Sequence, residues 1–582
     1  MTPPPAVPPA AVSAAPARSG GTNVLDWVSG RGDAPDDAHQ LARADASGSG
    51  PLTFPPGTYR IRSGLAFTRI CQLEPGAVLD IAAGATVHFR EGIQAGVHRI
   101  FRTAEGGRVI LAKTAVGYPE WWGPAPDRSA WLPALQACIA ACPITQLQQG
   151  DYAIGGELAI TTGHRTLRGV AKHWHGEGTS TRIVIDSPTA TGIHVFQEPA
   201  ARGYNDYLPE VRIQDLDVVR GQAPAPPPPG REGRAPAGIR LEQTRFVYLD
   251  HVTCQEHCVG FLLDGTIQSH LRDCFAFRSV PGARREGDFF CGYWLNGHAG
   301  PPPPAVGQFG NASSYLTDCT AAVGNAPPLA RCEGFRLDGA FRDTFLLRPE
   351  TTDCSVGIRI EGTRDSGDPE RRRKGNINLH LATPILDAFG QAGIWATDVA
   401  GLGAVTITGG YAAPAPPAPA PAACLRFQRC LGAMRVSGFQ CFGIASSACR
   451  AVTADHCRAI QLDGNLHVEF LAGAIDLADC ANLRVTDQCR NEGVGTGPAV
   501  RVSGATTRCY LAPTVTGTGG GRFGAGVEFV GGGASWNEVN GSGIDPAALA
   551  GGTGTRKIIF NGKPVRRPGI FGAHNLATGI VD

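Results

Sequence analysis

The stretch Gly334-Phe-Arg-Leu-Asp-Gly339 is followed, after seventeen residues, by Gly357-Ile-Arg-Ile-Glu-Gly362. The two copies begin 23 residues apart. A recurring unit of this length, with one strand in each copy, is typical of a solenoid. Apolar and polar residues alternate inside each copy, so Phe335 and Leu337 are expected to face a core and their polar neighbours to face outward.

The same unit recurs elsewhere in the chain. Its further copies are Gly238-Ile-Arg-Leu-Glu242, Gly260-Phe-Leu-Leu-Asp-Gly265, Gly292-Tyr-Trp-Leu-Asn-Gly297 and Ala459-Ile-Gln-Leu-Asp-Gly464. The glycines that flank each copy are expected to form the corners between strands. The repeats therefore predict an all-β solenoid whose length grows by the addition of coils.

The composition excludes several classes of protein. The chain has 582 residues with 78 Gly and only 2 Met, and its 52 basic and 51 acidic side chains nearly cancel. A nucleic-acid partner is not expected, because such proteins carry a basic excess or stripe. No apolar run is long enough to insert in a membrane. The N-terminus lacks the pattern of a signal peptide, so we expect assembly in the cytoplasm without signal-peptide secretion.

The 18 cysteines are too few for a disulfide scaffold. Several follow an aspartate, as in Asp273-Cys274, Asp318-Cys319, Asp353-Cys354 and Asp479-Cys480. We expect these thiols to stack as small buried apolar groups behind the corners. Zinc ligation is not favoured, because Cys138/Cys142 and Cys254/Cys258 each lack a second pair nearby in sequence.

Helical and loop segments surround the predicted coils. Residues 1–22 are Pro/Ala-rich and are expected to form a flexible tail. An amphipathic helix over 128–142 is expected to cap the open end of the solenoid. The Pro-rich segments cannot be central strands and are expected to leave the coils as loops. They lie at 223–230, 301–304 and 413–422, and a charged excursion lies at 361–374.

Two motifs near the N-terminus resemble a known superfamily. Asp36-Asp-Ala-His-Gln40 is expected to begin a short helix with acidic residues in its first turn, and Phe54-Pro-Pro-Gly-Thr-Tyr-Arg-Ile61 follows it. Together they are similar to the opening of the pectate-lyase-like, right-handed parallel β-helix superfamily. Glu120-Trp-Trp-Gly123 resembles the restart in phage tailspikes and related prophage proteins of that superfamily.

The resemblance and the repeats predict a right-handed parallel β-helix with an N-terminal capping helix and a small N-terminal β region. The expected parts are a tail over 1–22, a head over 23–118, the β-helix over 119–545, and a C-terminal cap or trimer contact over 546–582. The resemblance further implies a homotrimer that is attached to a phage or phage-like particle through its N-terminal region.

Two outward columns emerge from the repeated strand. The first column contains Arg240, Leu262, Trp294, Arg336 and Arg359, and the second contains Glu242, Asp264, Asn296, Asp338 and Glu361. Stacked coils bring members of one column within about 5 Å when they are true neighbours. Only the pairs of coils that begin at 238/260 and at 334/357 are close enough in sequence to be adjacent without doubt.

Closely spaced carboxylates can act as acid and base in glycoside cleavage. Asp338 and Glu361 are the main catalytic candidates, with Asp264 and Glu350 as weaker ones. Arg336 and Arg359 could bind sugar carboxylates, and Trp294 could stack on a sugar ring. The alternative is structural, because Asp-Gly is an ordinary turn pair and adjacent Arg and Asp columns neutralise each other.

A second candidate site is the segment His173-Trp174-His175. Trp174 could hold a sugar between the two histidines, or it could instead cover the first coils as a buried side chain. The two histidines with Glu177 make a poor metal site without a further ligand, so no metal or cofactor is expected.

The sequence thus favours a phage or phage-like spike that recognises bacterial surface polysaccharide and is located on the particle surface. If the spike is an enzyme, it cleaves glycosidic bonds with a carboxylate pair, or by β-elimination if the glycan contains uronic acids. The alternative is a non-catalytic glycan-binding spike or structural adhesin of the same fold. A free bacterial pectate-lyase-like enzyme is less favoured, because no export signal is visible.

Overall fold

The structure is a computed structural model of the chain. It describes residues 21–30, 35–123, 130–172, 180–198, 207–225, 235–279, 289–297, 311–324, 331–339, 341–362, 377–399, 404–416, 422–443, 449–493, 495–518, 520–531, 533–550, 557–572 and 574–580. The chain divides into two compact units, Met1–Gln146 and Leu147–Asp582.

The first unit is a short three-sided stack of parallel strands. One sheet contains β1 (Thr22–Asn23), β2 (Leu52–Phe54), β5 (Cys71–Leu73) and β8 (Ile93–Ala95). The second contains β4 (Leu65–Phe67), β7 (Thr86–Phe89) and β10 (Arg108–Leu111), and the third contains β3 (Gly57–Ile61), β6 (Ala77–Ile81) and β9 (Phe101–Thr103). A further parallel pair joins β11 (Val116–Gly117) and β12 (Ile144–Gln146). Phe54, Tyr59, Phe67 and Phe89 fill the interior with side chains that are fully buried.

Both expected helices are present in this unit, with one correction. The first, α1, covers Ala38–Ala46 and has no acidic residue in its first turn, so that part of the prediction is wrong. Asp36 and Asp37 precede the helix, where their carboxylates accept hydrogen bonds from the backbone amides of Arg62 and Arg60. The second, α2, covers Leu132–Ala141, and its role as a cap stays a prediction. No helix of the described residues has the length and apolar character to cross a bilayer.

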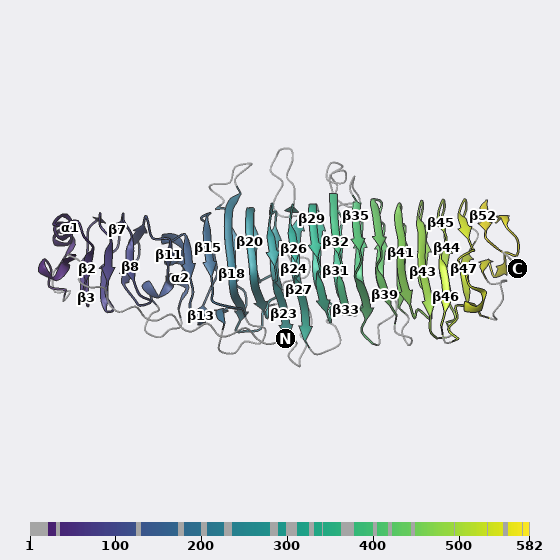
Figure 1. Cartoon of the computed structure of the whole chain (residues 1–582), viewed down its shortest axis with the longest axis horizontal. Helices are drawn as coiled ribbons and strands as arrows, with labels where there is room; N and C mark the ends of the chain where they lie inside the picture. The colour runs from purple at the N-terminus through teal and green to yellow at the C-terminus, as the bar shows by residue number, and fades with distance from the viewer. Residues whose placement is uncertain are drawn as a thin grey trace. The chain divides into compact units, whose positions relative to one another are not determined.

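The second unit is a right-handed parallel β-helix built from two long sheets, whose strands follow one another as successive coils (Figure 1). We name the fifteen-stranded sheet the wall sheet. Its strands are β14 (Leu158–Ile160), β17 (Ile193–Phe196), β19 (Ala237–Glu242), β21 (Val259–Asp264), β24 (Phe290–Gly297), β28 (Cys332–Gly339), β31 (Val356–Glu361), β34 (Ala392–Thr397), β37 (Ala423–Gln428), β40 (Arg450–Asp455), β42 (Ile475–Ala478), β44 (Pro498–Ser503), β47 (Ala525–Val530), β49 (Ile558–Phe560) and β50 (Lys563–Pro564).

The other sheet, which we name the bent sheet, forms the remaining sides of each coil. Some coils cross it as one long strand, and others cross it as two strands separated by a corner. Its strands in this unit are β13 (Gly150–Ile154), β15 (Arg165–Arg168), β16 (Thr181–Ile185), β18 (Leu208–Arg220), β20 (Thr244–Gln255), β22 (His270–Arg272), β23 (Phe275–Ser279), β25 (Asn311–Ala312), β26 (Tyr315–Thr317), β27 (Thr320–Gly324), β29 (Phe341–Leu347), β30 (Glu350–Thr352), β32 (Ile377–Ala382), β33 (Ile385–Phe389), β35 (Ala404–Thr408), β36 (Tyr411–Pro414), β38 (Ala433–Ser437), β39 (Gln440–Phe442), β41 (Ile460–Val468), β43 (Arg484–Asn491), β45 (Tyr510–Leu511), β46 (Thr514–Gly517), β48 (Glu538–Asn540), β51 (Gly569–Phe571) and β52 (Asn575–Thr578). The last strands pair antiparallel, β49 with β50 and β51 with β52.

The first glycine of each repeat does not form a corner, contrary to expectation. It lies inside a wall strand, where a Cβ would meet the carbonyl oxygen of the next coil. For Gly260, Gly292 and Gly334 the distance from such a Cβ to the next glycine's oxygen is 2.6, 2.6 and 2.7 Å. The glycine column thus runs through these coils where their backbones approach one another closely. The trailing glycines Gly265 and Gly339 do form corners, with φ of 61° and 75°.

The Asp-Cys pairs mark corners as predicted. Asp273, Asp318, Asp353 and Asp479 all have φ between 48° and 57°, a left-handed conformation that aspartate adopts more readily than most residues. The following cysteine then turns inward. All 18 cysteines are free and buried, which confirms that the thiols pack as small apolar groups.

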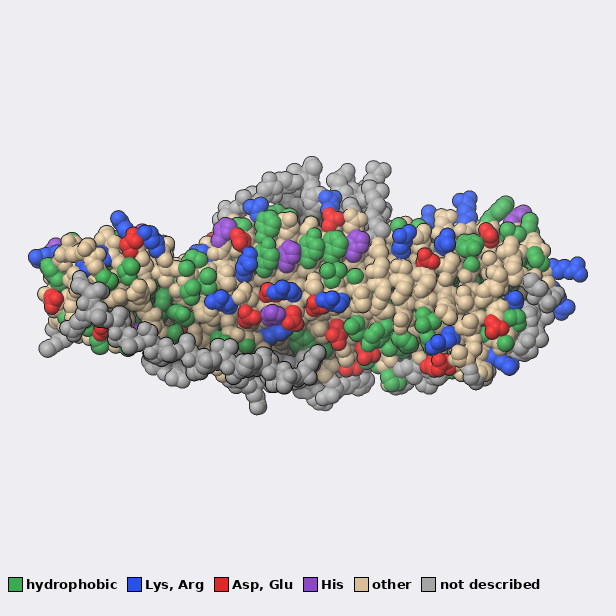
Figure 2. Space-filling model, in the orientation of Figure 1, with side chains coloured by type: hydrophobic (Ala, Val, Ile, Leu, Met, Phe, Trp, Pro, Cys, Tyr) green, Lys and Arg blue, Asp and Glu red, His purple; other side chains and the backbone are tan. Residues whose placement is uncertain are grey.

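Like side chains stack on like side chains in both the interior and the exterior. Inside, the ring centroids of Phe261, Tyr293 and Phe335 follow one another at 4.9 and 4.6 Å. Outside, an aromatic ladder runs along the bent sheet at spacings of 4.8 to 5.1 Å. The ladder consists of Tyr248, His270, Tyr315, Phe345 and His380. A row of hydrophobic and histidine side chains is visible over the second unit in Figure 2.

One predicted copy belongs to a different face. Ala459–Gly464 was expected to repeat the wall strand, but β41 lies in the bent sheet, where Leu462 pairs with Val436. Alternating residues that end in a left-handed glycine suit any side of the coil, since Gly464 has φ of 65° like the wall glycines. The other five copies are consecutive strands of the wall sheet.

The glycine column yields a stability prediction. Gly292→Ala should lower the free energy of unfolding by about 1–3 kcal/mol, because the new methyl group overpacks the contact between coils. Gly155→Ala is the matched control, since nothing lies within 4 Å of its Cβ position. Unfolding rates in denaturant should rise for Gly292→Ala only. Equal rates for the two variants would contradict the role assigned to this column.

Candidate functional site

The two predicted columns are continuous on the outer side of the wall sheet. Arg240, Leu262, Trp294, Arg336 and Arg359 pair in register through five consecutive strands. Glu242, Asp264, Asn296, Asp338 and Glu361 do the same. The stacking prediction is confirmed for every member, including those separated by long insertions.

Arg336 is the centre of a charged cluster on this surface. Its Nε donates to Asp338 Oδ2 at 2.6 Å, and its other nitrogens lie 3.4 Å from Glu333 and 3.5 Å from Glu361. Arg359 lies 3.8 Å from Glu333 and 3.7 Å from Glu361. Burial raises the pKa of the Glu333 carboxyl, although the two arginines oppose this shift. Three carboxylates thus surround two guanidinium groups.

The predicted residues differ in their access to solvent. The side chain of Asp338 is only 5% exposed, whereas that of Glu361 is 38% exposed. Asp264 is buried. Arg240 lies 2.7 Å from its Oδ2, and Asn296 donates a hydrogen bond to its Oδ1. Burial raises the pKa of Asp264, and attraction to Arg240 opposes this shift.

Trp294 does not offer a free ring face, contrary to expectation. The residue is 4% exposed and belongs to an apolar cluster with Leu262 and Phe289 on the outer side of the sheet. Its indole Nε1 donates to Asp338 Oδ2 at 2.9 Å, and the Arg336 guanidinium lies 4.6 Å from the ring centroid. An outward position in a strand therefore does not guarantee exposure.

The remaining predicted residues do not join this cluster. Glu350 begins β30 in the bent sheet, where Thr320 donates to its carboxylate at 3.4 Å. His173, Trp174 and His175 lie outside the described residues. The excursions that begin at 223, 301 and 361 also lie largely outside them. The segment 413–422 was expected to leave the coils, but its first two residues end β36, where Pro414 pairs with Phe389.

The columns extend beyond the predicted residues to a second arginine pair. Arg359 is followed in register by Trp395 and then by Arg426. The two guanidinium groups lie 4.5 and 4.2 Å from the Trp395 ring centroid. We name these three residues the Arg-Trp-Arg stack. In the sequence, this stack could have been found from Gly393-Ile-Trp-Ala, which has the Gly and the alternation of the repeat. This copy lacks the Asp-Gly turn by which the other copies were identified.

A groove of about 610 Å³ lies further along the same sheet. Its lining residues are Thr453, Ala454, Asp455, Asp476, Ala478, Arg501, Ser503, Glu528 and Val530. Asp476, Arg501 and Glu528 continue the first column in consecutive strands. Arg501 Nε lies 3.7 Å from Glu528 Oε2. Three carboxylates and one arginine thus face the groove.

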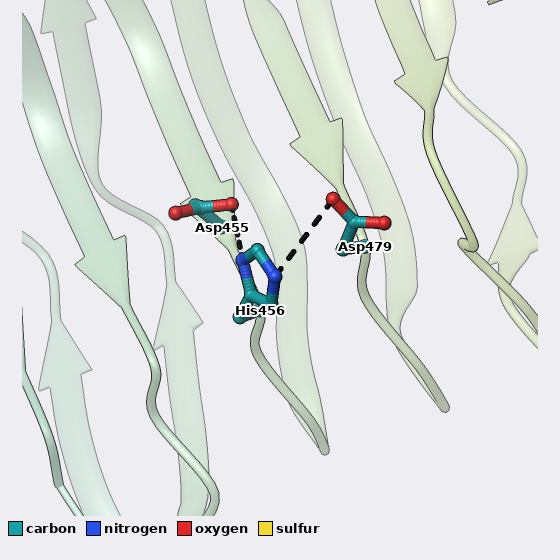
Figure 3. A group of neighbouring side chains, drawn as sticks. All are labelled: Asp455, His456 and Asp479. Carbon is teal, nitrogen blue, oxygen red and sulfur yellow. Dashed lines mark hydrogen bonds and ion pairs between the residues drawn. The ribbon is translucent and has the colours of Figure 1, made fainter. Parts of the chain in front are cut away.

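Asp455 also belongs to a small cluster at the edge of the sheet (Figure 3). His456 Nδ1 lies 2.7 Å from Asp455 and its Nε2 lies 3.9 Å from Asp479. One ligand atom of each residue lies within 4.8 Å of the others. The set could hold a cation, but His456 already has a carboxylate beside each ring nitrogen.

A separate network lies at the other end of the wall sheet. His194 Nδ1 lies 2.9 Å from Glu157, and its Nε2 lies 3.3 Å from Glu242. Arg240 also contacts Glu242 at 3.3 Å. Burial lowers the pKa of His194, but the hydrogen bonds with the two glutamates outweigh burial and hold that pKa above its usual value of 6.5.

Comparisons with known proteins find similarity in structure only. No protein-family model matches the chain, and no curated protein matches its sequence. A tailspike protein of E. coli bacteriophage HK620, a double mutant, superposes with a TM-score of 0.51 and 12% identity over 93% of this chain and 78% of that chain. This likeness establishes the shared fold.

Two further matches have lower scores. Another mutant of the HK620 tailspike, in complex with a hexasaccharide, has a TM-score of 0.47 and 11% identity over 93% of this chain and 78% of that chain. The A-module of the Azotobacter vinelandii mannuronan C-5 epimerase AlgE4 has a TM-score of 0.26 and 13% identity over 96% of this chain and all of that module. Both superpositions are too distant to support a comparison of individual residues.

The raised pKa of His194 predicts a pH dependence. A group with a raised folded-state pKa contributes stability that is fully present below its unfolded pKa, about 6.5, and is lost as pH rises through the folded pKa. Unfolding in denaturant should therefore become faster above about pH 6.5, and His194→Gln should flatten this slope. His164→Gln is the control, because the His164 side chain is 70% exposed. An unchanged slope in His194→Gln would contradict the assignment.

Proposed function

We propose that this protein is a tailspike or receptor-binding protein of a phage or phage-like particle, and that its wall sheet recognises a bacterial surface polysaccharide. The groove of about 610 Å³ beside the Arg-Trp-Arg stack carries this proposal. Charged, aromatic and hydroxyl side chains in one line along a solenoid suit an extended polymer better than a small compact ligand. The fold shared with the HK620 tailspike supports the same function.

The proposed spike acts as a homotrimer on the particle surface and is attached through its N-terminal region. It is assembled in the bacterial cytoplasm without signal-peptide secretion. Residues 546–582 cap the β-helix or contact a neighbouring subunit. Sedimentation equilibrium should give a mass three times the 60.8 kDa of the chain, and a monomeric mass would overturn this part of the proposal.

Two carboxylate pairs are candidates for glycosidic cleavage. Asp338 and Glu361 lie on adjacent strands whose backbones are about 4.8 Å apart, and carboxyl groups at that spacing would suit the short separation of retaining enzymes. Asp476 and Glu528 lie two strands apart, which separates their backbones by about 9.6 Å. That distance is close to the upper end of the range for inverting enzymes.

The pairs differ in how freely a substrate could reach them. In the pair of Asp338 and Glu361, Glu361 is the member that solvent can reach. Glu333, which lies beside this pair, suits the role of proton donor because burial raises its pKa. Asp264 and Glu350 remain weaker candidates, the former because it is buried and the latter because it lies in the other sheet. In the second pair both carboxylates line the groove. The groove pair is therefore our first choice for catalysis.

The alternative is a spike or structural adhesin that binds glycan without cleaving it. The ion pairs of Arg336 favour this alternative for the first carboxylate pair, since neutralised charges are typical of a structural network. Cleavage of capsular or exopolysaccharide should release new reducing ends, or unsaturated uronates that absorb in the ultraviolet if the reaction is β-elimination. Binding without either product would support the adhesin, and absence of binding would overturn the proposed function.

The catalytic pairs are distinguished by conservative substitutions. Asp476→Asn and Glu528→Gln should each lower the cleavage rate by a factor of about 10²–10⁴ while glycan binding is retained. Glu361→Gln is the matched comparison, because it removes one charge from the same face of the sheet. If Glu361→Gln or Asp338→Asn abolishes cleavage and the groove variants do not, the first pair is catalytic. The reducing-end assays should use equal amounts of folded protein.

A further inference from the structure

We propose that the Arg-Trp-Arg stack of Arg359, Trp395 and Arg426 binds a carboxylate-bearing sugar, so that the polysaccharide recognised by the wall sheet is acidic. This inference rests on the proposed function and names the class of glycan. It concerns a subsite that lies between the charged cluster of Arg336 and the acidic groove.

The stack is held by a hydrogen bond and two cation–π contacts, and it reaches solvent. Trp395 is held in place by its indole Nε1, which donates to Gln428 Oε1 at 3.0 Å. The two guanidinium groups pack on the ring, and the three side chains come from consecutive strands. All three residues are partly exposed. A guanidinium stacked on an aromatic ring keeps its N–H edge free for a carboxylate, which Arg can bind with two parallel hydrogen bonds.

The two arginines of the stack differ in how far nearby carboxylates neutralise their charge, and Arg426 is the less neutralised of the two. The closest carboxylates to Arg359 are Glu361 and Glu333 at 3.7 and 3.8 Å, and Arg336 competes for both. Arg426 has no carboxylate within 4.0 Å among the described residues. Burial and repulsion by Arg359 lower the pKa of Arg426, whereas attraction to Asp455 opposes this shift. An anion bound here would relieve the repulsion between the two arginines.

The neighbouring groove fixes where the acidic group of the glycan must lie. Asp455, Asp476 and Glu528 face the groove, and Arg501 is the only basic residue among its described lining, so like charges repel a carboxylate there. Thr453 alone separates Arg426 from Asp476 in the column. A polymer along the wall sheet would therefore place a carboxylate at the stack and a neutral sugar in the groove, about 10 Å away.

Sodium glucuronate tests the subsite without a polysaccharide. In protein labelled with fluorotryptophan, the Trp395 resonance, assigned with Trp395→Phe, should shift on addition of glucuronate. Glucose with sodium chloride at the same ionic strength should leave this resonance unchanged. Absence of a glucuronate shift, or an equal shift with glucose, would overturn the inference.

Substitutions at Arg426 give an independent test. Arg426→Gln should weaken glucuronate binding by at least about tenfold, the effect of one lost charge-assisted hydrogen bond, and Arg426→Lys should restore it only in part because lysine lacks the planar fork. Arg435→Gln is the control, since Arg435 is exposed on the bent sheet and contacts Gln461. Unchanged binding in Arg426→Gln would overturn the inference. If the unmodified protein binds glucuronate but binds no bacterial polysaccharide, the proposed function alone is overturned.

Discussion

Hydrogen bonding between successive coils sets the spacing on which the whole second unit depends. Parallel pairing holds neighbouring strands at about 4.8 Å, and the wall sheet keeps this register through Arg240, Arg336 and Arg426 alike. In the coils from Gly238 to Gly393, a glycine lies where a Cβ would come within 2.9 Å of the next coil's carbonyl oxygen. The register then continues with Cys424 and Ala451 at the same position. Once the coils are in register, residues at equivalent positions must stack, whatever their chemistry. The interior aromatic stack and the exterior ladder follow from the same constraint.

This constraint explains what the sequence could predict. The repeated Gly-x-Arg-x-Asp pattern contains the strand, its two faces and its corner, so the members of both columns could be predicted from the repeats alone. The same pattern could not show which side of the coil a given copy occupies. The copy Ala459–Gly464 was therefore assigned to the wall sheet, although it lies in the bent sheet. Alternation separates inside from outside, but it does not separate one outer face from another.

The environment of each outward side chain was less predictable. Trp294 and Asp338 face away from the interior, yet both are buried. Trp294 packs against Leu262 and Phe289, and Asp338 accepts hydrogen bonds from Trp294 and Arg336. Glu333 was missed because it precedes the repeat, and Trp395 because its copy lacks the turn residues. Exposure depends on contacts among several coils, which a single strand pattern does not contain. The roles of Asp338, Glu361, Arg336 and Arg359 remain predictions, although their stacking is confirmed.

The chemistry of the wall sheet changes along its length. The first part is a network of paired charges around Arg240 and Arg336. The middle part exposes two arginines against one indole, and the last part is an acidic groove. Such an order favours a long polymer over a single monosaccharide, because only a polymer can contact the middle and the last part at once.

The repeats also begin at unequal intervals. Successive wall glycines at 238, 260, 292, 334 and 357 are separated by 22, 32, 42 and 23 residues, yet their strands pair without a shift in register. Extra residues are therefore accommodated outside the stacked strands. Evolution can lengthen or replace these segments, and so alter the borders of a binding surface, while the lattice of side chains at its centre stays unchanged. The borders of a binding surface and the architecture beneath it can in this way diverge at different rates.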